Sequence, residues 1–245
     1  RLASSHAEVA RLFRGAAVMR GNTVEEVYPG HPGLVLASGV LRSMAWGFPR
    51  SETSKRTGKP LKPRPANNTR SENLGSPMWR DSFVARRCLI PLTEFAEAEG
   101  EKGAMTRTWF ALPDQPIFAA AGIWRDTGEW GPAYSMLMTE ACIHVAGIHD
   151  RMPVILPPTA WDCWTGGTPH EALQLCRPYE GAVTIRRTAD RWSMRRSTRT
   201  GWASPTHWSR WGPTSSCTRT DCRPARAASR AANSSRQRSS PARRL

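Results

Sequence analysis

The 245-residue sequence has no apolar run that approaches the ~20 residues needed to cross a bilayer, and it lacks the apolar core of a secretory signal peptide. The first absence argues against a membrane protein, and the second argues against export. We therefore expect no membrane partner and a cytoplasmic location.

Cysteine and histidine are scarce and poorly spaced for metal binding. The cysteines form no Cys-x-x-Cys pair and no zinc-ligand spacing, and a chain of this length needs no disulfide staples. A metal-dependent His-Asp phosphohydrolase would need more ligand histidines, and His31, His144 and His170 have no fitting spacing. We predict reduced thiols, no metal and no cofactor. The cysteines are Cys88, Cys142, Cys163, Cys176, Cys217 and Cys222.

The segment from Arg191 to Leu245 lacks isoleucine, valine, phenylalanine, tyrosine and lysine. It carries 13 arginines and one acid, a net charge of +12, and subtracting 12 from the formal +15 leaves only +3 on residues 1–190. So few apolar side chains cannot offset an ordering cost of roughly 1–2 kcal/mol per residue. We predict a folded domain over 1–192 and a disordered tail over 193–245. The tail is either a nucleic-acid-binding arm or an out-of-frame translation, and the abrupt change in composition favours the second.

The pattern along residues 1–192 is dominated by strands. Capping boxes at 5–8 and 168–171, each a Ser or Thr followed three residues later by Glu, predict two helix starts. Ser38-Gly39 splits two β-rich runs and predicts a hairpin. Residues 49–66 hold five prolines or glycines and no apolar period, which predicts a long exposed loop. No β-α alternation appears, so we predict a single compact, mostly antiparallel β-rich α+β domain. The other strand-like runs are 86–91, 107–112, 116–124, 133–139 and 182–185.

Four polar segments interrupt this apolar pattern. Each segment alone predicts only structure: a buried tryptophan before a turn, a loop whose asparagines cap backbone amides, a solvated carboxylate, and a charged loop that enters a strand. The last segment places a histidine, a carboxylate and a guanidinium before an apolar run, which is also typical of an active-site edge. The segments are Trp46-Gly47-Phe48, Asn67-Asn68-Thr69-Arg70-Ser71-Glu72, Arg86-Arg87-Cys88-Leu89-Ile90-Pro91 with Glu94-Phe95-Ala96-Glu97, and His149-Asp150-Arg151-Met152-Pro153.

In this order and at this spacing, the segments resemble the SRAP family, the SOS response-associated peptidases, also called abasic-site processing proteins. The family pattern runs from W-G-[LF] through N-[AT]-R and R-R-C-[LI]-[IV]-P to H-D-R-M-P-V-I-L, with a glutamate six residues after the first proline. Here Pro91 is followed six residues later by Glu97. The resemblance covers residues 1–192 and implies a compact β-rich α+β domain.

The resemblance implies a protein that recognises abasic sites in single-stranded DNA during the DNA damage response and captures them covalently. An N-terminal cysteine offers an amine, which condenses with the sugar aldehyde in lyase-like chemistry, and a thiol, which closes a thiazolidine ring. The same cysteine would remove its own leader, as a peptidase or hydrolase does. The implied partner is single-stranded DNA containing abasic sites, bound by a monomer in a bacterial cytoplasm, at the nucleoid during repair.

Carried over onto this sequence, the resemblance implies three catalytic residues. Asn68 would orient the amine of the nucleophile, and Glu97 would shuttle protons around it. His149 would promote opening of the sugar ring, since imidazole exchanges protons near neutral pH.

The resemblance also implies residues that bind DNA. Arg70 and Arg151 would bind the flanking phosphates through the paired hydrogen bonds of a guanidinium. Trp46 would stack beside the missing base, or would simply fill the core. Cations of the 49–66 segment would line a DNA channel, or would only keep the protein soluble. They are Lys55, Arg56, Lys59, Lys62 and Arg64.

The chain departs from the family pattern at its start. It begins Arg1-Leu2-Ala3, where the family begins Met-Cys and a few further residues. Cys88 and Cys142 cannot replace that nucleophile, because an internal cysteine has no free α-amine. We therefore expect the chain as written to form no covalent adduct. The alternative function is a non-catalytic single-stranded DNA-binding module, in which arginines and the basic loop bind phosphate and no bond forms.

Overall fold

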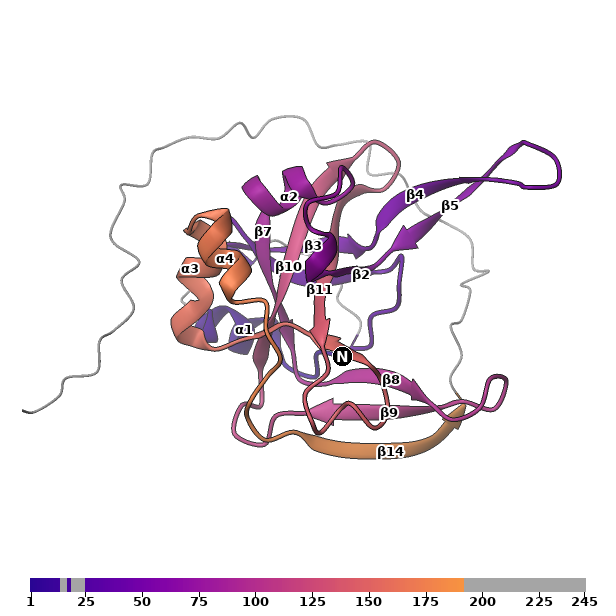
Figure 1. The fold of residues 1–245 in the computed structure, drawn as a ribbon. Helices are drawn as coiled ribbons and strands as arrows, with labels where there is room; N and C mark the ends of the chain where they lie inside the picture. The colour runs from indigo at the N-terminus through magenta and orange to yellow at the C-terminus, as the bar shows by residue number, and fades with distance from the viewer. Residues whose placement is uncertain (14–16, 19–24, 192–245) are drawn as a thin grey trace, which may run out of the picture. The chain divides into compact units, whose positions relative to one another are not determined.

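The computed structural model describes residues 1–13, 17–18 and 25–191, and the tail predicted over 193–245 lies outside them. In the described part strands dominate, and most neighbouring strands are antiparallel (Figure 1). The predicted β-rich α+β fold is therefore confirmed.

The largest sheet curls until its path closes. Its strand order is β1-β3-β2-β7-β10-β11-β12, and β11 also pairs with β3, so that β3, β2, β7, β10 and β11 form a ring. Strands β12 and β13 lie where β10 and β11 diverge, since Val154 between them bonds to the backbone of both neighbours. A further short strand, β6, pairs with β11 just beyond the residues of β11 that pair with β3. The strands are β1 (Ala17–Val18), β2 (Pro32–Ala37), β3 (Val40–Trp46), β6 (Asn68–Arg70), β7 (Arg87–Leu92), β10 (Phe118–Thr127), β11 (Gly131–Glu140), β12 (Arg151–Pro153) and β13 (Ile155–Leu156).

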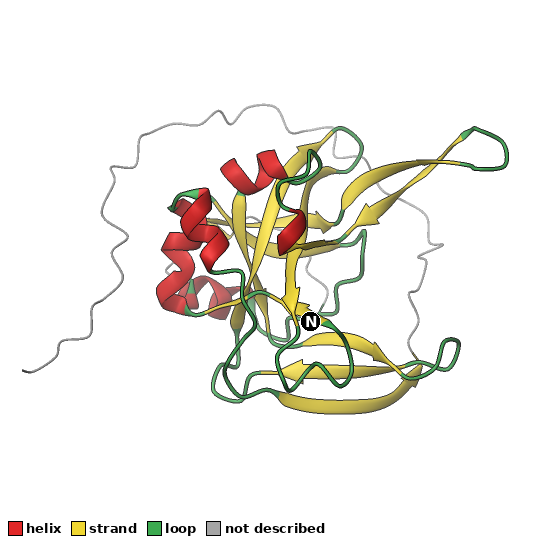
Figure 2. Cartoon of the chain, in the orientation of Figure 1, coloured by secondary structure: helices red, strands yellow, loops and turns green. Residues whose placement is uncertain are grey.

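Helices pack against one side of this sheet, and a three-stranded sheet packs against it elsewhere (Figure 2). Strand β7 lies between the two layers. Leu89 packs in the cluster that contains Trp164, whereas Ile90 packs in the cluster that contains Phe110 of the second sheet. The helices are α1 (His6–Leu12), η1 (Ser71–Asn73), α2 (Arg80–Ala85), η2 (Pro158–Ala160), α3 (Trp161–Gly166) and α4 (Pro169–Gln174). The second sheet has the order β14 (Thr184–Arg191), β9 (Thr106–Ala111), β8 (Phe95–Glu99). Among the described residues, no helix is both long enough and apolar enough to cross a membrane.

Several local predictions are confirmed. Both capping boxes form, with Ser5 and Thr168 as N-cap residues of α1 and α4. The hairpin between β2 and β3 turns at Ser38 and Gly39, whose φ angles are 51° and 73°. Positive φ at two successive residues is the geometry that matches the twist of a two-residue hairpin. The predicted final strand is β14, which begins at Thr184.

The prediction of a long loop over 49–66 is wrong. This segment forms an antiparallel two-stranded ribbon of β4 (Phe48–Thr53) and β5 (Pro60–Ala66). The sequence of this ribbon shows no alternation of polar and apolar residues, because most of its residues are exposed on both faces. Its prolines do not break it, since β5 pairs only with β4 and its other edge needs no backbone donors.

Candidate active site

Strand β11 aligns three predicted site residues along one edge. Trp46 at the end of β3 pairs with Tyr134, and Asn68 at the start of β6 pairs with Met136, both in parallel register. Arg70 follows two residues later on β6. Because side chains alternate along a strand, Asn68 and Arg70 point to the same face of β6.

A cleft of about 190 Å³ opens beside this edge, between the main sheet and the three-stranded sheet. Trp46 and Asn68 line the cleft from the main sheet, and Glu97 lines it from β8. Three residues predicted from separate motifs therefore meet at one cavity. The first residue of the chain, Arg1, also lines it, with its backbone nitrogen 3.0 Å from the carbonyl oxygen of Glu94.

Glu97 lies next to His149. Oε2 of Glu97 is 3.9 Å from Nε2 of His149, and the two side chains keep only 17% and 37% of their surface exposed. Burial raises the pKa of Glu97 from its ordinary 4.5 to about 7; the charge of His149 opposes this rise in pKa, and that of Asp150 adds to it. A carboxyl group with this pKa both gives and accepts protons near neutral pH. The interpretation of Glu97 as a solvated carboxylate, based on its acidic neighbours in the sequence, is therefore wrong.

The backbone of Arg151 holds the imidazole of His149 in place. Its N–H donates to Nδ1 over 3.1 Å, and its carbonyl oxygen lies 3.0 Å from the same atom. When Nδ1 is unprotonated it accepts from the N–H, and when it is protonated it donates to the carbonyl. Both protonation states of His149 thus have a partner at Nδ1, while Nε2 faces Glu97.

The two predicted phosphate-binding arginines differ. Arg70 is exposed. Arg151 is mostly buried, with 18% of its side chain exposed, and its guanidinium donates to Oε1 of Glu72 over 2.7 Å. Arg70 can meet a phosphate directly, whereas Arg151 must exchange or share the carboxylate of Glu72.

Trp46 packs against the core and also lines the cleft, so its position is compatible with both predicted roles, core filling and stacking on DNA. Its indole packs against the core cluster, and Nε1 donates to the carbonyl oxygen of Asn67 over 2.9 Å. The same indole lines the cleft. Its position beside Asn68 is therefore fixed by a hydrogen bond from the side chain itself.

Among the cysteines that the structure describes, none lines this cleft. Cys88 on β7 has no exposed surface, and burial raises the pKa of its thiol well above the ordinary value. Cys142 is also buried, just after β11. Over residues 1–13, 17–18 and 25–191, no three His, Cys, Asp or Glu side chains gather in a way that could hold a metal ion.

One wall of the cleft consists of residues that no sequence motif marks. Arg107 donates to Glu26 and to the hydroxyl of Tyr28, over 3.0 and 3.2 Å, and its guanidinium carbon lies 5.4 Å from the ring centroid of Trp109. Arg107, Tyr28 and Trp109 all line the cleft. Arg107 and Trp109 share one face of the predicted strand 107–112, because residues two apart on a strand point the same way, but this pattern does not distinguish a cleft wall from any other face. No local pattern marked Tyr28.

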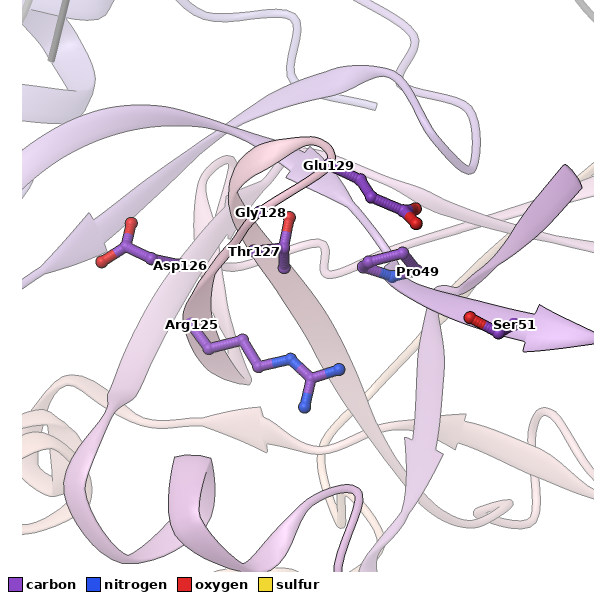
Figure 3. Close-up of a pocket in the computed structure, with 7 residues that line it drawn as sticks. All are labelled: Pro49, Ser51, Arg125, Asp126, Thr127, Gly128 and Glu129. Atoms are coloured by element: carbon purple, nitrogen blue, oxygen red, sulfur yellow. The ribbon is translucent and has the colours of Figure 1, made fainter.

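A second pocket lies at the turn between β10 and β11 (Figure 3). Arg125 lines it and lies over the ring of Phe48, with 4.2 Å between the guanidinium carbon and the ring centroid. None of the residues predicted for catalysis or DNA binding lines this pocket, so its chemistry is separate from that of the cleft. Its lining residues are Pro49, Ser51, Arg125, Asp126, Thr127, Gly128 and Glu129.

Comparison with known proteins gives a consistent result. Abasic site processing protein YoqW of Bacillus subtilis is 32% identical over 122 residues, which are 46% of this chain and 54% of that protein. Abasic site processing protein YoaM of the same organism is 33% identical over 95 residues, 36% of this chain and 42% of that protein. The chain thus spans about half the length of the curated relatives it matches.

The fold also has solved counterparts. A crystal structure of a protein from Bordetella bronchiseptica superposes with a TM-score of 0.62 at 21% identity, covering 74% of this chain and 94% of that one. A model of the family described as SOS response associated peptidase (SRAP) matches residues 2–191. The chain therefore belongs to the SRAP family.

Proposed function

We propose that this protein processes abasic sites in single-stranded DNA by capturing the sugar aldehyde covalently. Family membership and the names of the two Bacillus relatives support this activity. The observation that carries it is the Glu97–His149 pair, 3.9 Å apart beside a cleft that Asn68 also lines. A proton-exchanging pair at a cavity is what condensation of an amine with an aldehyde needs.

The proposed chemistry consumes no external reagent. The ring-opened sugar presents an aldehyde, the amine of an N-terminal cysteine adds to its carbon, and loss of one water gives an imine. The thiolate then adds to the imine carbon, and the nitrogen takes up a proton to give a thiazolidine. His149 protonates the departing oxygen, Glu97 takes protons from the amine and the thiol, and Asn68 orients the amine by hydrogen bonding.

A nucleophile joined ahead of Arg1 would approach the cleft at the wall that Arg1 lines. The backbone nitrogen of Arg1 lies on the cleft wall, and its carbonyl oxygen accepts from the backbone N–H of Thr93 over 3.0 Å. A cysteine joined ahead of Arg1 would therefore place its amine and thiol in the cavity that Asn68 and Glu97 line. The proposed autoproteolytic peptidase step would use the same thiol, on a leader that precedes the cysteine.

The test compares proteins that differ only ahead of Arg1. One begins Met-Cys, a second carries one additional glycine after the cysteine, and matched controls have serine in place of cysteine. Each is incubated with a single-stranded oligonucleotide that contains one abasic site. We expect a heat-stable shifted band with at least one cysteine protein and none with serine. A band from the sequence as printed would show that the nucleophile lies elsewhere.

A second candidate, a non-catalytic single-stranded DNA-binding module, is favoured by the exposed Arg70, two residues after the cleft residue Asn68 on β6. Fluorescence anisotropy with the same oligonucleotide distinguishes the two functions. Salt-sensitive binding by every cysteine protein, without a covalent band from any of them, would leave only the binding module.

A further inference from the structure

We propose that the β4–β5 ribbon is a second DNA-contacting element, which holds the phosphate backbone of the nucleic acid that leaves the cleft. The proposal rests on the proposed function, because it assumes that DNA occupies the cleft. It assigns a role to the segment 48–66, which lies outside the catalytic machinery.

The ribbon carries four cations without a partner of opposite charge. Lys55, Arg56, Lys59 and Lys62 are exposed, and none of them joins an ion pair within the part of the chain that the structure describes. The other two cations of the ribbon differ, because Arg50 and Arg64 lie 2.6 and 3.6 Å from the carboxylate of Glu52. Unneutralised cations on an exposed element attract a polyanion and release its counterions on binding.

The base of the ribbon is built from the site itself. Strand β4 begins two residues after Trp46, and β5 ends two residues before Asn68. The hydrogen bond from Nε1 of Trp46 to the carbonyl oxygen of Asn67 joins the two ends. Gly47 has a φ of 121°, and a Cβ at this position would lie 2.5 Å from Cβ of Pro65, so the two strands approach closely at the base. The ribbon therefore has a fixed origin beside the residues that would contact the abasic site.

The shape of the ribbon suits a nucleic acid better than a peptide. Strand β5 has prolines at 60, 63 and 65, which donate no hydrogen bonds and hinder the addition of another strand along its edge. An exposed ribbon of this kind can lie along the phosphate backbone of a single strand that leaves the cleft. In Figure 1 it extends away from the other strands. Its seven-residue strand, at about 3.3 Å per residue, reaches roughly 20 Å.

This reach sets the length of DNA that the ribbon can contact. At 3.4 Å per nucleotide along a stacked strand, roughly 20 Å corresponds to about six nucleotides. An abasic oligonucleotide of about five nucleotides, with the abasic site at the cleft, would not reach the tip of the ribbon, and one of about twenty would reach it. The contribution of the ribbon should therefore depend on DNA length, unlike that of the cleft.

The experiment uses the protein with the N-terminal cysteine that forms the covalent band. The ribbon variant carries Lys55→Ser, Arg56→Ser, Lys59→Ser and Lys62→Ser. The control carries the same change in charge on exposed residues of other segments, Arg11→Ser, Arg80→Ser, Lys102→Ser and Arg177→Ser. Thermal unfolding checks that both proteins fold as the parent does.

We expect the ribbon variant to bind the long oligonucleotide about tenfold more weakly or worse at low salt, with a salt slope smaller by about three. Its affinity for the short oligonucleotide, and its rate of covalent capture at saturation, should equal those of the control. Equal loss of affinity in both variants, or a ribbon effect independent of length, would overturn the role of the ribbon and leave the proposed function intact. Absence of any covalent band from the parent protein would instead remove the proposed function.

Discussion

Oε2 of Glu97 and Nε2 of His149 lie 3.9 Å apart although 51 residues separate them in the sequence. Glu97 belongs to β8 of the three-stranded sheet, whereas His149 precedes β12 of the main sheet. The pair therefore forms only when the two sheets pack together. Burial raises the pKa of the Glu97 carboxyl to about 7, and this rise has a cost in stability that can be measured.

Glu97→Gln should stabilise the protein at neutral and alkaline pH. Folding raises the pKa of this carboxyl from 4.5 to about 7. Between these two pH values the carboxyl is ionised in the unfolded chain but still protonated in the folded protein, so the free energy of unfolding falls as pH rises. The loss is complete above about pH 7. The difference corresponds to about 3 kcal/mol. We expect the variant to exceed the parent by roughly this free energy of unfolding at pH 8.5 and by almost nothing at pH 4, measured by urea denaturation. Glu101→Gln, an exposed carboxylate, should change little at either pH.

His149→Asn should remove the chemistry and leave binding in place. Asparagine keeps a hydrogen-bonding group near Nδ1 but cannot exchange protons at Nε2. In the protein with an N-terminal cysteine we expect the rate of covalent capture to fall about 10²-fold or more, with single-stranded DNA affinity within about twofold. Rates come from gel-shift time courses and affinities from anisotropy. His144→Asn, an exposed histidine in the same connection, is the matched control and should behave as the parent does.

Local signals predicted local structure, and long-range packing decided the rest. The cap formed by Ser5 and Glu8 and the turn at Ser38 and Gly39 can be predicted from sequence, because a cap or a turn depends on residues only a few positions apart. The motifs also named Asn68 and Glu97, which the structure brings to one cleft. The burial of Glu97 could not be predicted, because the residues that bury it come from another sheet.

The error at 49–66 has a different cause. Its strands carry proline and charge on both faces, so neither propensity nor alternation distinguishes this ribbon from a loop. Only the pairing of Phe48 with Ala66 and of Arg50 with Arg64 reveals it. Three members of the cleft wall, Tyr28, Arg107 and Trp109, had no motif to mark them.

Glu72→Gln should strengthen DNA binding. The carboxylate of Glu72 holds the guanidinium of Arg151 over 2.7 Å and competes with a phosphate for it. Removing this charge frees the cation and also lowers the repulsion of DNA. We expect a dissociation constant about two- to fivefold lower at low salt, with the gain disappearing at high salt. Asp114→Asn removes an exposed acid elsewhere and should give a smaller gain. Weaker binding by Glu72→Gln would mean that Glu72 positions Arg151 for phosphate.

Substitutions at Trp46 separate stacking on DNA from core filling. Trp46→Phe keeps an aromatic face but loses the hydrogen bond to Asn67, whose carbonyl oxygen still accepts from Met136 and Ser135. We expect a loss of about 1 kcal/mol in stability and little change in affinity for single-stranded DNA. Trp46→Leu also removes the aromatic face. If a base stacks on this indole, losing the contact should cost about 1–3 kcal/mol of binding free energy, which raises the dissociation constant about five- to 150-fold.

The control for Trp46→Leu is Trp130→Leu, which removes a partly buried indole from the core cluster away from the cleft. It should lower the melting temperature without changing DNA affinity. If Trp46→Leu behaves in the same way, with a lower melting temperature but unaltered DNA binding, the indole of Trp46 only fills the core. In that case the proposed recognition of the abasic site would rest on Asn68 and on the charged residues of the cleft. If Trp46→Leu instead lowers the affinity for single-stranded DNA, while Arg70 is still present to bind phosphate, the indole of Trp46 is the surface on which a base stacks.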